Sequence, residues 1–210
     1  RDVERSRGLG DVYKRQPGDT VMVHHTTITP CQKEYLLAFH KPAGIVCTTS
    51  KIDKNNVIDY LNFPERIYPV GRLDKESTGL LLLTNNGQLM DDILRGSNYH
   101  EKEYIVHVNK PITDSVLQAM AQGVPILDTI TRPCKIRRMG KDCFYITLTQ
   151  GLNRQIRRMC EYFDYRVTSL KRIRIMNIEL GSLPVGKWRE LTTSEIKTLK
   201  NLAQNKGEAE

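Results

Sequence analysis

Short apolar stretches separated by turn residues run along most of the chain. Several alternate apolar and polar residues or are rich in β-branched residues, which is typical of β-strands. The run of four leucines at 80–83 is continuous, as in a fully buried strand. The predicted strands and extended segments are 20–28, 35–39, 45–49, 67–70, 80–84, 104–108, 129–137, 144–149 and 172–180.

Other segments repeat apolar residues at three and four positions, the spacing of one face of a helix. The clearest case, 153–163, has an apolar side and a charged side. The apolar side holds Ile156, Met159, Cys160 and Phe163, and the charged side holds Arg154, Arg157, Arg158 and Glu161. The predicted helices are 57–61, 88–95, 114–122, 153–163 and a last one that a capping box of Thr192 and Glu195 begins. Because helices are dispersed between hairpin-like pairs of strands, we expect an α+β fold with a mainly antiparallel sheet.

Positive charge is concentrated in two segments of the chain. The 210 residues include 32 Lys and Arg against 24 Asp and Glu, a net charge of +8. Residues 131–141 hold five basic residues and no acid, and residues 151–175 hold seven basic residues against two acids. Clustered cations are typical of proteins that bind polyanions such as nucleic acids. Runs of charge also occur simply as solvated surface, so charge alone does not decide the function.

The composition argues against several other classes of protein. No apolar run approaches the roughly 20 residues that cross a bilayer, and the first twenty residues lack the apolar core of a signal peptide. The five cysteines are widely spaced without a Cys-x-x-Cys pair, which argues against a disulfide framework and a zinc site. We therefore expect a cytoplasmic protein that holds no metal and no cofactor.

The segment 71–79 reads Gly-Arg-Leu-Asp-Lys-Glu-Ser-Thr-Gly and leads directly into the predicted strand of leucines. A buried strand would hold this loop rigidly, and a carboxylate fixed there, that of Asp74, can act as a nucleophile or general base. The same pattern fits a surface turn in which Asp74 and Ser77 satisfy backbone donors. Judged by itself, the loop favours the simpler turn.

Two further segments add a tyrosine and several arginines to this picture. Tyr104 opens a predicted strand, and the arginines follow a turn at Gly151. The chain contains, in order, YPVGRLDKESTGLLLLTNNGQL, HEKEYIVHVNKPIT, GVPILDTIT and GLNRQIRRMCEYFDYRVTSLKRIRIMNIELGSLPVGKWRELT. With these segments, and over about residues 35–202, it resembles the RsuA/RluB/RluE/RluF family of rRNA pseudouridine synthases. The second and third segments are most similar to the F-type large-subunit enzymes.

The resemblance implies a fold and a set of site residues. The fold would be the α+β pseudouridine synthase fold: a mainly antiparallel mixed sheet in two lobes, with flanking helices and a central active-site cleft. Asp74 would be the catalytic aspartate, Tyr104 the active-site tyrosine and Arg157 the partner of Asp74. A guanidinium beside a carboxylate favours its ionised form, which a nucleophile or base needs. The implied substrate-binding residues are Arg72, Leu73, Leu170, Arg154 and Arg158.

The resemblance also implies the reaction. The enzyme would isomerise a uridine of large-subunit (23S) rRNA to pseudouridine, with a tRNA as a candidate second substrate. The C1′–N1 bond breaks, the uracil rotates and C5 rejoins the sugar, so no redox cofactor is needed. The base must leave its stack, and Tyr104 would stack on it, a contact worth about 1–3 kcal/mol. We expect a monomer that does not bind membranes.

The family usually begins with a small S4 RNA-binding domain, and here only PGDTVMVHH resembles its closing strand. We expect a disordered or non-native leader at 1–16 and a remnant of the S4 domain at 17–30. The catalytic domain would span 31–203, followed by a flexible tail at 204–210.

Two alternative functions stay open. A non-catalytic RNA-binding or ribosome-assembly factor would bind RNA with a steep salt dependence but would not turn it over. A glycosidase using Asp74 and Glu76 would need the two carboxylates to face each other across a sugar at about 5–9.5 Å. Their two-residue spacing in a loop gives no assurance of that geometry.

Overall fold

The computed structural model describes residues 21–23, 26–28, 33–50, 52–95 and 99–204. The chain divides into two compact units between Lys33 and Glu34. In the first unit, β1 (Val21–Val23) pairs antiparallel with β2 (Thr26–Ile28). The single strand expected over 20–28 is therefore wrong, because the chain reverses direction within it. The expected leader at 1–16 and residues 205–210 of the tail expected at 204–210 lie outside the described residues, whereas Gln204 belongs to the last helix.

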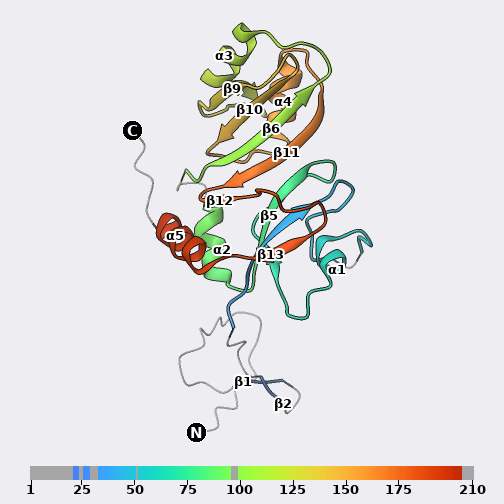
Figure 1. The fold of residues 1–210 in the computed structure, drawn as a ribbon, viewed down its shortest axis with the longest axis vertical. Coiled ribbons are helices and arrows are strands. Elements are labelled where there is room, and N and C mark those ends of the chain that lie inside the picture. Colours follow the sequence, from blue (N-terminus) through green and yellow to red (C-terminus); the bar gives the residue numbers. More distant parts are fainter. Residues whose placement is uncertain (1–20, 24–25, 29–32, 51, 96–98, 205–210) are drawn as a thin grey trace. The chain divides into compact units, whose positions relative to one another are not determined.

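The second unit is built around one large sheet. It contains β3 (Leu36–Lys41), β4 (Tyr68–Pro69), β5 (Thr78–Thr84), β6 (Lys102–Val108), β9 (Lys135–Arg138), β10 (Cys143–Leu148), β11 (Val167–Ile175), β12 (Ile178–Glu179) and β13 (Trp188–Glu190). The main path of the sheet runs β13-β3-β5-β11-β6-β10-β9, with β4 beside β5 and β12 beside β11. Figure 1 shows β5, β11, β6, β10 and β9 in this order. A separate small hairpin consists of β7 (Pro125–Ile126) and β8 (Thr129–Ile130).

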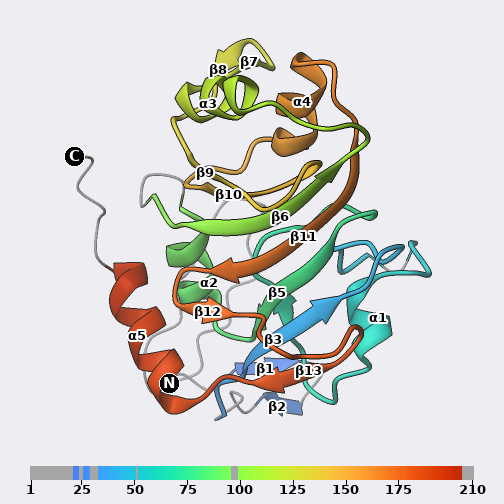
Figure 2. The ribbon, with the colours of Figure 1, turned by 45° about the horizontal axis from the view of Figure 1, so that its top comes forward.

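The sheet has two antiparallel halves that meet at one parallel pair, β5 and β11. One half holds β13, β3, β4 and β5, and the other holds β11, β12, β6, β10 and β9 (Figure 2). At this seam Arg172 lies beside Gly79, which has a φ of 109°. A Cβ at Gly79 would overlap the backbone of Arg172. Glycine is therefore required where the two halves come together.

Five helices flank the sheet in the described part of the chain: α1 (Val57–Leu61), α2 (Gly87–Leu94), α3 (Asp114–Gln122), α4 (Gln155–Tyr162) and α5 (Thr193–Gln204). Residues of β5 alternate between two apolar cores. Leu81 and Leu83 join the core that includes buried residues of α1, α3 and α4, whereas Leu80 and Leu82 join the core that includes those of α2 and α5. Both faces of β5 are covered, which explains a run of leucines without alternation. No helix among the described residues is long and apolar enough to cross a membrane.

Most predicted elements are confirmed with bounds shifted by a few residues, and three more are wrong. The segment 45–49 forms only an isolated bridge, between Val46 and Asn56. The segment 129–137 is divided between β8 and β9, which belong to different sheets. The segment 172–180 contains the end of β11, a turn and β12. Ile175 and Ile178 are cross-strand partners in the same core, so the apolar pattern continues through the turn.

Candidate active site

A cleft of about 840 Å³ opens at the seam between the two halves of the sheet, a size typical of ligand sites. The loop before β5 forms one wall. Residues of β6 and β11 line the cleft as well, and the connection from β10 to α4 completes it. Elements far apart in the sequence therefore meet at one site. The cleft contains Leu73, Asp74, Tyr104 and Leu170, four of the residues expected at the site.

A buried lysine holds the loop that carries Asp74. The side chain of Lys41, at the end of β3, is fully buried. Its Nζ donates to the carbonyl oxygens of Pro42 at 2.8 Å, Lys75 at 3.3 Å and Ser77 at 2.9 Å. Burial lowers the pKa of the Lys41 ammonium, and the nearby Asp74 carboxylate acts in the opposite direction. Lys41 was not among the residues expected at the site, although a lysine that ends an apolar strand and precedes a proline is a usable signal.

Other backbone contacts fix the same loop. The Gly44 amide donates to the Lys75 carbonyl at 2.8 Å, and the Ser77 amide donates to the Asp74 carbonyl at 3.0 Å. The Leu73 amide donates to the Cys47 sulfur at 3.4 Å. The loop is therefore held on both sides of Asp74, as a preorganised catalytic group requires.

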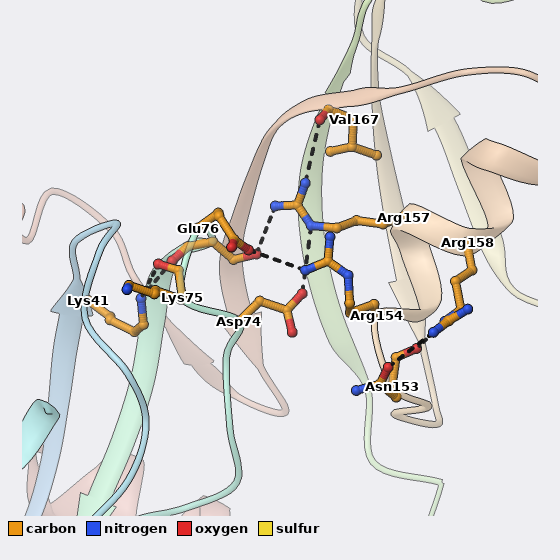
Figure 3. A network of polar contacts seen from close by, with 10 residues as sticks. Lys41, Asp74, Lys75, Glu76, Asn153, Arg154, Arg157, Arg158 and Val167 are labelled. Carbon is orange, nitrogen blue, oxygen red and sulfur yellow. Dashed lines mark hydrogen bonds and ion pairs between the residues drawn. The ribbon is translucent and has the colours of Figure 1, made fainter. Parts of the chain in front are cut away.

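Asp74 faces Arg157 of α4 (Figure 3), and of the two only Asp74 is among the residues that line the cleft. The Arg157 Nε lies 3.7 Å from the Asp74 Oδ2, and the side chains are 11% and 30% exposed. Arg157 also donates through Nη2 to the Ser77 hydroxyl at 3.3 Å and through Nη1 to the Val167 carbonyl at 3.5 Å. These contacts aim the guanidinium at the carboxylate. The pair joins residues 83 positions apart and leaves part of the carboxylate open to a ligand.

Tyr104 lies in β6 on the floor of the cleft and is 9% exposed. Its neighbours across the sheet are Arg172 of β11 and Ile146 of β10. The buried side chains of Leu73 and Leu170 also line the cleft. A cleft lined by an aromatic ring, apolar side chains and a carboxylate suits a flat polar ring such as a pyrimidine.

The three remaining arginines expected to bind substrate differ in position. Arg72 is exposed and lines the cleft. Arg154 lines it too, and its Nη1 lies 3.3 Å from a Glu76 carboxylate oxygen. Arg158 instead donates to the main-chain and side-chain oxygens of Asn153, at 3.1 and 3.4 Å (Figure 3). Arg158 is not among the residues that line the cleft.

The cleft also has polar groups that the sequence analysis missed. Lys102 and Arg172 line its floor, and Gln150 lines its wall. The Nε2 of Gln150 and the Nη2 of Arg172 are buried without a hydrogen-bond partner. Within the described residues, no group of three His, Cys, Asp or Glu side chains could hold a metal ion. The cleft therefore offers polar donors, an aromatic side chain and the carboxylates of Asp53 and Asp74, the second of which faces Arg157.

Comparisons with known proteins agree with this geometry. Residues 35–162 match the family described as RNA pseudouridylate synthase. The chain is 50% identical over 199 residues to the dual-specificity RNA pseudouridine synthase RluF of Escherichia coli K12, covering 94% of this chain and 68% of that protein. It is 32% identical over 196 residues to the ribosomal large subunit pseudouridine synthase B of Bacillus subtilis strain 168, covering 89% and 80%.

A solved structure shares the fold as well. The crystal structure of a pseudouridylate synthase superposes with a TM-score of 0.74 at 30% identity, covering 82% of this chain and 76% of that one. The expected fold, with its two-lobed, mainly antiparallel mixed sheet, is confirmed. The chain belongs to the RNA pseudouridylate synthase family, within its RsuA/RluB/RluF group.

Proposed function

We propose that this protein converts a specific uridine of large-subunit (23S) rRNA to pseudouridine, with Asp74 as the catalytic carboxylate acting on a flipped-out nucleotide. The observation that carries the proposal is the pairing of Asp74 with Arg157, where Asp74 lines a cleft that Tyr104 also lines. The names of the two curated relatives support the reaction, and that of the Bacillus subtilis protein supports the large subunit as its target.

Each of the three central residues has a distinct task in this proposal. Arg157 places a positive charge 3.7 Å from the Asp74 carboxylate and helps to orient it. The carboxylate acts at the nucleotide whose C1′–N1 bond is broken. Tyr104 supports the uracil by stacking, so that the detached base stays in the cleft while C5 replaces N1 at the sugar. Leu73 and Leu170 exclude water from the same space.

The base reaches this site by leaving its stack. Unstacking costs a few kcal/mol and costs least in loops and bulges of RNA. The partial burial of Asp74 supports base flipping, since a carboxylate inside a cleft cannot reach C1′ of a nucleotide within a helix. Arg72 and Arg154, at the lining of the cleft, would contact the surrounding RNA.

The proposal also covers the RNA substrates, the limits of the domains, the oligomeric state and the location of the enzyme. The relatives named dual-specificity support a second RNA substrate, for which we propose a tRNA. We propose residues 31–203 as the catalytic domain and 17–30 as the remnant of an S4 domain. The enzyme would act as a monomer in the cytoplasm, where rRNA is modified.

The decisive experiment measures release of tritium from rRNA that is labelled at C5 of uridine. Asp74→Asn keeps the size of the side chain but removes the carboxylate, so we expect the rate to fall about 10³-fold or more. Glu76→Gln changes an exposed acid of the same loop, and we expect it to lower the rate of tritium release less than tenfold. Undiminished release by Asp74→Asn would overturn the assignment of Asp74. Wild-type protein that binds rRNA but releases no tritium would establish a non-catalytic binder instead.

A further inference from the structure

Two positive charges lie on the floor of the cleft and have no role in the chemistry described above. Arg172 on β11 lies directly opposite Tyr104 on β6, and Lys102 lies two residues before that tyrosine. Side chains two apart on a strand, and cross-strand partners, share one face of a sheet. Lys102, Tyr104 and Arg172 therefore all face the cleft, which all three line.

The guanidinium of Arg172 is buried but incompletely bonded. Arg172 is 3% exposed. Its Nε donates to the Leu80 carbonyl at 2.7 Å, and its Cζ lies 6.0 Å from the centre of the Tyr104 ring. Its Nη2 is buried with no hydrogen-bond partner. A buried donor without a partner is costly, so a ligand that accepts from Nη2 would relieve that cost.

Lys102 is half-buried, and its Nζ donates to the His100 carbonyl oxygen at 3.5 Å. Burial, and then the positive charge of Arg172, lower the pKa of Lys102 to about 8. In the part of the chain that the structure describes, no carboxylate forms an ion pair with either residue. By contrast, Arg157 faces Asp74 and Arg154 faces Glu76.

Arg172 is buried and Lys102 is half-buried, and neither forms an ion pair with the Asp53 or Asp74 carboxylate that lines the same cleft, so the two cations can accept a further negatively charged ligand. We propose that Lys102 and Arg172 form a subsite for one phosphate group of the RNA backbone, adjacent to the extruded uridine. The proposal rests on the proposed function, because it assigns a part of the same substrate to the same cleft. A phosphate offers several acceptor oxygens, which suit a guanidinium and an ammonium together. The uracil ring is neutral and would leave both charges uncompensated.

The test compares uridine 5′-monophosphate, uridine 3′-monophosphate and uridine as ligands of the whole protein. Their dissociation constants are measured by nuclear magnetic resonance titration of the methyl groups of Leu73 and Leu170, which line the cleft. Lys102→Met keeps the length of the side chain and removes its charge. We expect it to weaken at least one of the two monophosphates about tenfold and to leave uridine unchanged.

Lys171→Met is the matched control. Lys171 precedes Arg172 and points to the opposite face of β11. The substitution Lys171→Met therefore removes one positive charge outside the cleft, as Lys102→Met does inside it. We expect the affinity of Lys171→Met for the monophosphates to match that of the wild type. Inorganic phosphate, titrated in the same way, should compete with the preferred monophosphate in the wild type and more weakly in Lys102→Met.

Three outcomes would overturn the subsite. These are equal weakening of uridine and the monophosphates, no weakening of either monophosphate, or the same weakening in Lys171→Met. The measurement needs no turnover, so it is separate from the tritium experiment. A protein that turned over rRNA but bound the monophosphates equally well with and without Lys102 would retain the proposed function and lose the subsite.

Discussion

The basic residues of 131–141 and those of 151–175 have different surroundings. Several residues of the first group lie in β9, at the end of the main path of the sheet. The Lys135 side chain there is 83% exposed. There the Arg137 guanidinium lies 4.0 Å from the centre of the Tyr145 ring. The second group includes Arg172, which is buried at the seam, and Arg157, whose side chain is 11% exposed, and hydrogen bonds direct both guanidinium groups.

The difference bears on what each group can do. Exposed charges attract a polyanion over a distance and are screened by salt, so their exact geometry matters little. Buried charges interact more strongly and only in one geometry. We therefore expect residues 131–141 to contribute to affinity for RNA in general and residues 151–175 to contribute to positioning and turnover.

The largest effect should follow from disturbing the seam. Gly79→Ala places a methyl group against the backbone of Arg172 at a φ of 109°. We expect the free energy of unfolding to fall by about 4 kcal/mol, measured by urea denaturation. Gly44→Ala is the control, since Gly44 has a φ of 89° but nothing within 4 Å of the new methyl group. Gly44→Ala should lower the free energy of unfolding by only about 1–2 kcal/mol. Equal losses would show that the seam is not tightly packed.

The next effect separates two adjacent arginines of α4. Arg157→Met removes the charge opposite Asp74, so we expect turnover at saturating RNA to fall about 10²-fold. Arg158→Met removes a charge that contacts only Asn153 among the hydrogen bonds of the described residues, and it should change turnover by less than threefold. Both rates come from tritium release under single-turnover conditions. The distinction fails if the two variants lose activity equally.

A smaller effect is expected on the exposed side. Arg137→Met should weaken binding of rRNA about threefold and reduce the salt slope of the binding constant by about one phosphate contact, with turnover at saturation unchanged. Filter binding at several KCl concentrations measures both quantities. Lys197→Met on α5 removes an equal charge elsewhere and should leave the slope closer to the wild-type value. A fall in turnover at saturating RNA would contradict the division between the two groups.

The smallest effect concerns Glu101, where the two groups meet. Its carboxylate lies 3.0 Å from Lys135 Nζ and 3.0 Å from Arg174 Nη2. The Lys135 hydrogen bond, helped by Arg174, lowers the pKa of Glu101 below 4.5 in the folded protein. The resulting stabilisation is present above pH 4.5 and is lost as the pH falls through the lower, folded value. Glu101→Gln should therefore lower the free energy of unfolding by about 0.5 kcal/mol at pH 7 and by less at pH 3. A difference that stays constant with pH would exclude this ion pair as its cause.

Local patterns in the sequence predict much of the fold. The two faces of α4 are as expected, with Ile156 and Met159 buried. The helix 114–122 is confirmed with the predicted bounds. The strand error at 172–180 has a physical reason: alternation continues through a tight turn when the residues on both sides enter the same core. Periodicity reports which face a residue occupies and not where the chain reverses.

The site depends on contacts that no local pattern encodes. Asp74 and Arg157 come together only through the pairing of β5 with β11, and the sequence pointed to them through family resemblance. Lys41, Lys102 and Arg172 were missed because lysine and arginine are ordinarily exposed, so a single sequence gives their burial low weight. Their burial, complete for Lys41, nearly complete for Arg172 and partial for Lys102, follows from their places in the folded sheet.

The parallel pairing of β5 with β11 also constrains when activity can arise. Parallel neighbours need a long connection, and here residues 85–166 lie between the two strands. Contacts of such high sequence separation form slowly during folding, because loop closure must precede them. Synthesis proceeds from the amino terminus, so Asp74 is made long before Arg157. A nascent chain therefore has no complete site until β11 has emerged and joined the sheet.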